Sequence, residues 1–114
     1  MAITVIDRSV SRRELAEIAK HQFGNLVKAV VDIERGVMAV GGELHADGEA
    51  VLLEQGSKQE NLWGINLYPE KTGEDFIEFD SLINVRPSQH NSSRGVEDGV
   101  VQDRIRTVVQ KRTG

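Results

Sequence analysis

Glu43, His45 and Asp47 form the most suggestive chemical group in the sequence, because they occupy alternate positions. On a β-strand, alternate side chains point to the same face, so these three groups would lie together. An imidazole between two carboxylates could ligate a divalent metal, or act as a base that a carboxylate orients. Exposed faces of antiparallel sheets carry the same residue types without any chemistry. The three residues are therefore catalytic candidates for a metal-assisted hydrolase, without the spacing of a known metal motif.

A second polar group is the run NVRPSQHNSSRG at residues 84–95. Its two arginines offer planar guanidinium groups to a phosphate or carboxylate, and free backbone amides near a helix start would add to such a site. The alternative is that its Asn and Ser residues only form turns. The expected ligand-binding residues are Arg86, Ser88, Gln89, Asn91, Ser92 and Arg94.

The composition narrows the class of protein. A chain of 114 residues that is 39% apolar can bury one core, which predicts a single domain over residues 1–114. Its apolar runs fall far short of the roughly 20 residues that span a bilayer, so we expect no membrane partner. The first residues lack the features of a signal peptide, and the sequence contains no cysteine. A cytoplasmic location is therefore expected.

The charge and the motifs argue against several partners. The net charge is −4, whereas proteins that bind duplex nucleic acid usually carry a basic surface. Aromatic residues are too rare, at 4%, to favour stacking on single strands. Neither a phosphate loop, a dinucleotide-binding glycine pattern nor a serine-nucleophile elbow is present. We therefore expect no cofactor, and the sequence favours a binding module over an enzyme.

Two helices are predicted by their ends and their apolar stripes. Ser11 and Glu14 have the spacing of a capping box, which predicts a helix over about 12–23. Asp98 precedes a second stripe and basic residues follow it, which predicts a helix over about 99–111. These two helices are the elements that should cover the sheet.

Residues 26–40 have the apolar spacing of either a helix or a hairpin. Their β-branched residues and their alternation favour a hairpin with a two-residue loop at Arg35-Gly36, whose second strand continues to Ala46. This register pairs Val31 with Val40, Ile33 with Met38, and Lys28 with Glu43.

The remaining segments complete the predicted sheet. Residues 49–54 could form a strand or a short helix, and residues 62–68 place Trp63 on the apolar face. After the hairpin, residues 76–86 form the clearest predicted strand, which would place Asn84 and Arg86 on a polar face. We therefore expect an α+β domain with a meandering, mainly antiparallel sheet and two helices packed on one face. That polar face would carry Asn66, Tyr68, Glu78, Asp80, Asn84 and Arg86 together with the three catalytic candidates.

Three blocks carry a resemblance to a known family: VKAVVDIERGVMAVGGELHADGEAVLLEQGSKQENLWGINLYPE, DFIEFDSLINVRPSQ and NSSRGVED. Together they resemble a family of small uncharacterised proteins from bacteria and archaea, a domain of unknown function. The resemblance covers nearly the whole chain and implies a single domain. It brings no reaction, ligand or catalytic residue with it.

Three functional hypotheses follow. The leading one is a small cytoplasmic module that binds an anionic small molecule, or a protein partner, through loop 86–94 and the polar sheet face. The second is the hydrolase built on Glu43, His45 and Asp47. The third is a homodimer formed through an exposed strand edge, for which residues 3–6 are the candidate.

Overall fold

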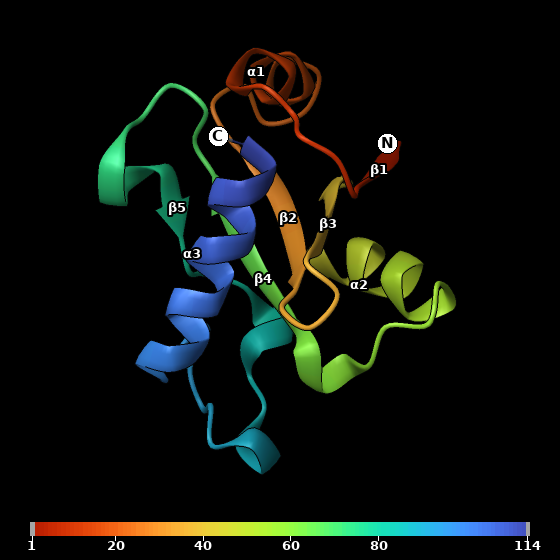
Figure 1. Ribbon diagram of the computed structural model, residues 1–114, viewed down its shortest axis with the longest axis vertical. Coiled ribbons are helices and arrows are strands. Elements are labelled where there is room, and N and C mark those ends of the chain that lie inside the picture. The colour runs from red at the N-terminus through yellow and green to blue at the C-terminus, as the bar shows by residue number, and fades with distance from the viewer. Residues whose placement is uncertain (1, 114) are drawn as a thin grey trace.

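The computed structural model describes residues 2–113, in which five strands form one antiparallel sheet in the order β1-β3-β2-β4-β5 (Figure 1). The strands are β1 (Ile3–Ile6), β2 (Val27–Asp32), β3 (Val37–Gly41), β4 (Leu62–Leu67) and β5 (Ile77–Glu78). The α-helices are α1 (Arg12–Lys20), α2 (His45–Glu54) and α3 (Gly99–Thr113). Short 3₁₀ turns are η1 (Gln59–Asn61), η2 (Gly73–Phe76), η3 (Leu82–Asn84) and η4 (Pro87–Gln89). The expected α+β class and antiparallel sheet are confirmed.

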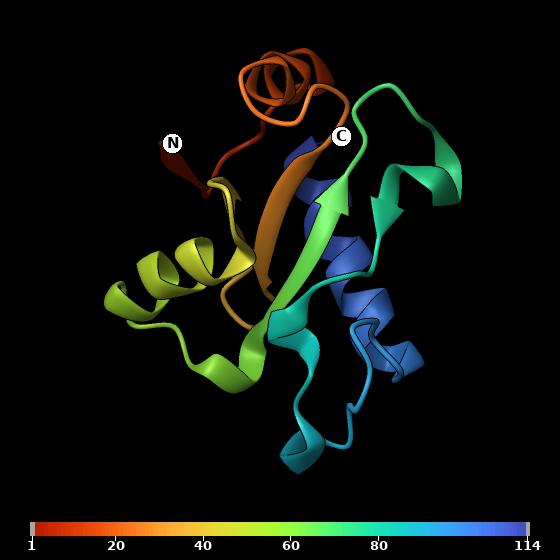
Figure 2. The same ribbon diagram turned by 180° about the vertical axis from the view of Figure 1, so that it is seen from behind.

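Helices cover both faces of the sheet. Leu15 of α1 and Ile105 of α3 pack into the larger core cluster, so the two predicted helices share one face. Leu52 of α2 packs into a separate cluster with Val30 and Ala39 on the opposite face. Figures 1 and 2, seen from opposite sides, show α3 in front of the sheet and then behind it. The two predicted helices lie on one face, as expected. The prediction missed the third helix, α2, which covers the face expected to be polar and exposed.

The hairpin over residues 26–40 is confirmed, but its register is not. β2 and β3 pair Ala29 with Val40 and Val31 with Met38, so the loop comprises residues 33–36. The expected pairings were wrong by two residues. The side chain of Asp32 explains the longer loop, because its Oδ1 accepts the amides of Glu34 and Arg35 at 2.9 Å each. These hydrogen bonds give two backbone amides of the loop an acceptor, and they favour a four-residue loop over a two-residue loop.

The second hairpin strand ends at Gly41 rather than continuing to Ala46. Gly41 and Gly42 have φ values of +95° and +80°, a left-handed conformation that breaks a strand. A Cβ on Gly41 would lie 2.5 Å from the carbonyl oxygen of Ala2, so only glycine fits there. Of the alternating polar residues beyond it, Glu43 lies in a bend, whereas His45 and Asp47 lie in the first turn of α2. The expected cross-strand pair of Lys28 with Glu43 therefore does not form.

The predicted strand over residues 76–86 is reduced to the two residues of β5. Beyond β5, the side chain of Asn84 pairs with the backbone of Gly64 in β4, accepting from its nitrogen at 2.8 Å and donating to its oxygen at 2.9 Å. A Cβ on Gly64 would lie 2.5 Å from Ser81, so the two segments touch where β4 lacks a side chain. A side-chain amide thus replaces the backbone ladder that the alternation suggested.

The two predicted helices are confirmed with small changes at their ends. The hydroxyl of Ser11 accepts the amide of Glu14 at 3.0 Å, and the carboxylate of Asp98 accepts that of Val100 at 2.8 Å. Within residues 2–113, no helix has the length and apolar content required to cross a membrane. β1 lies at one edge of the sheet and pairs only with β3. The homodimer through this edge stays a prediction.

Candidate functional site

The structure does not bring Glu43, His45 and Asp47 into one site. Glu43 is exposed in the bend before α2, whereas His45 is buried at the first position of that helix. The carboxylate of Asp47 accepts the amide of Leu44 at 3.3 Å, which makes Asp47 part of the helix cap. In the described part of the chain, no three His, Asp or Glu residues are grouped so that they could hold a metal ion.

His45 instead faces the sheet. Its Nε2 lies 2.8 Å from the carbonyl oxygen of Ile65, so this nitrogen carries the proton in the neutral ring. Burial lowers the pKa of His45, and the Ile65 hydrogen bond partly offsets that effect. Nearby, Glu78 accepts from Asn66 at 2.8 Å and from Tyr68 at 3.1 Å. Part of the expected polar group does exist, but its members bond to one another.

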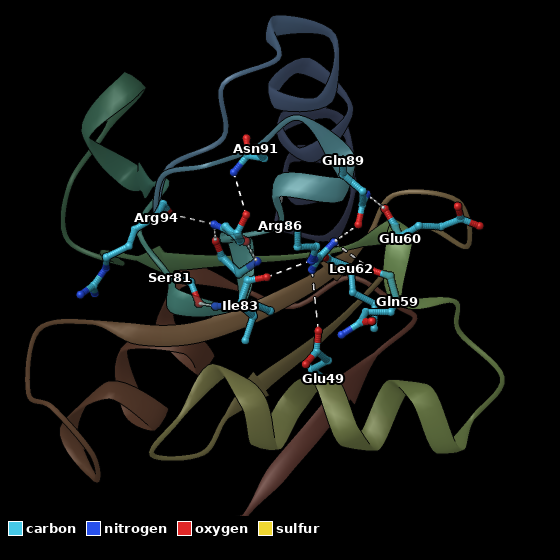
Figure 3. Close-up of polar contacts among 12 residues, drawn as sticks. Glu49, Gln59, Glu60, Leu62, Ser81, Ile83, Arg86, Gln89, Asn91 and Arg94 are labelled. Carbon is cyan, nitrogen blue, oxygen red and sulfur yellow. Dashed lines mark hydrogen bonds and ion pairs between the residues drawn. The ribbon is translucent and has the colours of Figure 1, made fainter.

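Arg86 is a buried structural cation (Figure 3). Four of its five N–H groups donate hydrogen bonds, to the carbonyl oxygens of Ile83, Gln59 and Leu62 and to the side-chain oxygen of Gln89. The guanidinium also forms an ion pair with the carboxylate of Glu49. Burial lowers the pKa of Arg86, and the Glu49 carboxylate, 3.7 Å away, opposes that effect. A ligand could reach this guanidinium only by displacing those partners.

The loop after Arg86 already contains an anion of its own. The backbone amides of Ser92 and Ser93 donate to Oε2 of Glu97 at 2.8 and 2.9 Å. Hydrogen bonds from the Ser93 side chain, followed by the Ser92 and Ser93 amides, lower the pKa of Glu97. The amides expected to be free for a ligand therefore bind a carboxylate of the same chain.

The other residues of the expected binding set are divided. Asn91 is buried, and its side chain bonds to the backbone of Asn84, Ser93, Gly95 and Glu97. Arg94 is exposed and pairs with Asp80 at 2.7 Å. Figure 3 shows its side chain pointing away from Arg86. Ser88 and Ser92 are exposed. The two arginines consequently do not form one anion clamp.

A groove that the sequence analysis missed lies between α3, α1 and the segment around β5. Its volume is about 620 Å³, within the range typical of small-molecule sites. Phe76, Ile77 and Phe79 line it from one side, and Val109 lines it from α3. The groove therefore has an apolar surface on two different elements.

Two arginines flank this apolar surface. The guanidinium carbon of Arg12 lies 3.8 Å from the ring centroid of Phe76, and that of Arg106 lies 5.2 Å from the ring centroid of Phe79. Stacking orients a guanidinium while its N–H groups stay available at its edges. Arg12 uses Nη1 to bond the carbonyl oxygens of Lys71 at 2.7 Å and Pro69 at 3.4 Å. Arg106 uses Nη1 to pair with the exposed Asp103 at 3.0 Å and Nη2 to bond Gln102 at 3.4 Å. Each arginine therefore keeps further donors.

The sequence held only a weak signal for this groove. Phe76 interrupts the polar side of the predicted strand. Arg12 lies within the capping box, where the helix start already accounts for its position. Arg12 and Arg106 are far apart in the sequence, so no local spacing links them. Only the packing of α1 and α3 on the same face brings both to one groove.

Comparison with known proteins identifies a family but no activity. A family model described as a protein of unknown function, DUF5674, matches residues 4–112. No curated protein and no solved structure matches the chain. The family match covers the buried residues of both core clusters, the loop, and the lining of the groove except Thr113, and it agrees with the resemblance in the sequence. The chain belongs to the DUF5674 family.

Proposed function

We propose that this protein is a small cytoplasmic binding module whose groove holds an organic anion with an aromatic or aliphatic body. The observation that carries the proposal is the pairing of two arginines with two phenylalanines along one groove of about 620 Å³. Sites for small molecules are typically apolar concavities with a few polar groups that fix the ligand's orientation.

The charges of the groove favour an anion. Arg12 and Arg106 are its cationic residues, and Glu74 is the one acidic residue that lines it. Arg12 also lies in the first turn of α1, where the helix dipole favours negative charge. The phenyl rings would contact the apolar body of the ligand, while the guanidinium edges would bond its carboxylate, sulfonate or phosphate group.

The anionic ligand was expected at loop 86–94, and the proposal moves it to the groove. Arg86 is buried, donates four hydrogen bonds within the chain and pairs with Glu49, and the loop amides bond Glu97. Arg94 alone, exposed and paired with Asp80, offers neither an apolar surface nor a second cation. β1 is one edge strand of the sheet, whereas the groove is lined by residues around β5, the other edge strand. A homodimer through β1 is therefore compatible with a ligand in the groove, and so is a protein partner.

The proposal is tested with two fluorescent probes of similar shape. Anilinonaphthalene sulfonate carries an anionic group, whereas N-phenylnaphthylamine lacks it. We expect Arg106→Gln to weaken binding of the sulfonate about tenfold, because one charge-assisted hydrogen bond is lost. The affinity for the neutral probe should be unchanged, and Phe79→Ala should weaken binding of both probes.

Arg13 provides a matched control, because it is exposed beside Arg12 and does not line the groove. Arg13→Gln changes the net charge as much as Arg12→Gln does, but it should leave the sulfonate affinity unchanged. Thermal unfolding of each variant separates lost binding from lost folding. Equal sulfonate affinity in Arg106→Gln, Arg12→Gln and Arg13→Gln would refute the proposed site.

A further inference from the structure

The two arginines of the groove lie near opposite ends of it. Arg106 is in the middle of α3, whereas Arg12 begins α1, beside the last turn of α3 (Figures 1 and 2). The backbone amide of Val10 donates to the carbonyl oxygen of Arg112 at 2.6 Å, which holds the start of α1 at that end of α3. Thr113 lines the groove there, and the helical rise places it about 10 Å along the axis from Arg106.

The opposite wall of the groove is consistent with that spacing. The guanidinium of Arg12 lies on the ring of Phe76, just before β5, and that of Arg106 lies on the ring of Phe79, just after it. An extended backbone places the Cα atoms of these two phenylalanines up to about 10 Å apart. Both walls therefore indicate two cations at separate ends of the groove, and not one clamp around a single acid group.

Each guanidinium keeps donors for a ligand. Within residues 2–113, Arg12 donates hydrogen bonds through Nη1 only, so its Nε and Nη2 edge is without a partner. Arg106 donates through Nη1 and Nη2, the latter in a long bond of 3.4 Å to Gln102, and its Nε has no partner in the same range. The Nε and Nη2 edge of an arginine matches the two oxygens of a carboxylate. Each end of the groove can therefore bind an acid group.

The middle of the groove is aliphatic. Ile77 follows Phe76 on one wall, and Val109 lies between Arg106 and Thr113 on the other. Glu74, the one acidic residue in the lining, is exposed, so water and salt reduce its repulsion of an anion. A ligand that spans the groove would thus place an apolar chain between its two charged ends.

We propose that the ligand of this groove is an elongated organic dianion, with an acid group at each end of an unbranched aliphatic chain. The inference rests on the proposed function and adds the class of ligand to it. Arg12 would bind one acid group and Arg106 the other. Once the first group is bound, the second pairing is intramolecular, so a dianion of the right length binds more tightly than a monoanion.

The test compares suberate with its monomethyl ester by isothermal titration calorimetry. The two compounds have the same chain, but the ester carries one acid group where suberate has two. We expect the native chain to bind suberate about tenfold more tightly than the ester, because one further charge-assisted pairing forms.

The variants show whether both arginines cause this preference. Arg12→Gln and Arg106→Gln should each bind the two compounds with similar affinity, whereas Arg13→Gln, outside the groove, should keep the native preference for suberate. Thermal unfolding confirms that each variant is folded.

The outcomes separate this inference from the proposed function. Equal affinities of the native chain for both compounds would overturn the dianion, and so would a preference for suberate that persists in either groove variant. The proposed function survives these results if the double variant Arg12→Gln with Arg106→Gln loses binding of the ester. If the native chain binds neither compound, the inference and the proposed function fail together.

Discussion

The loop around Arg86 and the groove beside Arg12 are both rich in arginine, but they use it in opposite ways. Arg86 is buried, donates four hydrogen bonds to its own chain and forms an ion pair with Glu49. Arg12 and Arg106 lie on phenyl rings at the protein surface and keep donors at the groove. The first region stabilises the fold, and the second is the proposed binding site.

This contrast shows that residue type alone does not identify a binding arginine. Loop 86–94 has the composition of an anion site, and its anion is Glu97 of the same chain. No local run of residues in the sequence marks the groove, because its lining residues come from three separate segments. The useful criterion is the number of donors that remain without a partner after folding.

The largest expected effect is at Arg86. Arg86→Met should lower the free energy of unfolding by about 3–5 kcal/mol, because it leaves the carboxylate of Glu49 and several backbone carbonyls without partners. Arg94→Met breaks only an exposed ion pair and should cost less than about 1 kcal/mol. Urea denaturation of both variants measures the difference. Similar losses in the two variants would remove the distinction between a structural and a surface arginine in this loop.

The next effect concerns the contact that holds the loop region on β4. A Cβ at Gly64 would overlap Ser81, so Gly64→Ala should destabilise the protein by about 1–3 kcal/mol. Gly99 begins α3 and has open space around it, so Gly99→Ala should change stability by less than about 0.5 kcal/mol. Thermal unfolding compares the two. A neutral Gly64→Ala would show that residues 81–84 are less firmly packed than the Asn84 hydrogen bonds indicate.

The smallest effect is the pH dependence of the internal anion. The pKa of Glu97 is lowered in the folded protein, so its stabilising contribution is complete above the ordinary glutamate pKa. That contribution is lost as the pH falls through the lower, folded value. Melting temperatures of the native chain and Glu97→Gln, measured from about pH 6 to about pH 3, should therefore converge at the acidic end. A constant difference across this range would mean that Glu97 is not the anion of the loop.

Local features of the sequence determined much of the fold. Ser11 and Asp98 mark the starts of α1 and α3 correctly, because a cap needs only the amides of the next few residues. The β-branched alternation over residues 26–40 identified the hairpin, because its two strands are also close in the sequence. The burial of Trp63 also followed from its position on the apolar side of β4.

Only the tertiary structure decided the register, the third helix and the sites. Residues 45–54 follow the glycines that end β3, and as a helix they bury the apolar residues on that face of the sheet. The periodicity of residues 45–54 alone indicates neither of these causes. Arg86 is structural because carbonyl groups more than twenty residues earlier in the chain accept hydrogen bonds from its guanidinium group. The groove exists because α1 and α3 pack beside β5. Contacts between distant segments determine which N–H groups of each arginine have an acceptor and which remain free. No local sequence pattern predicts those contacts.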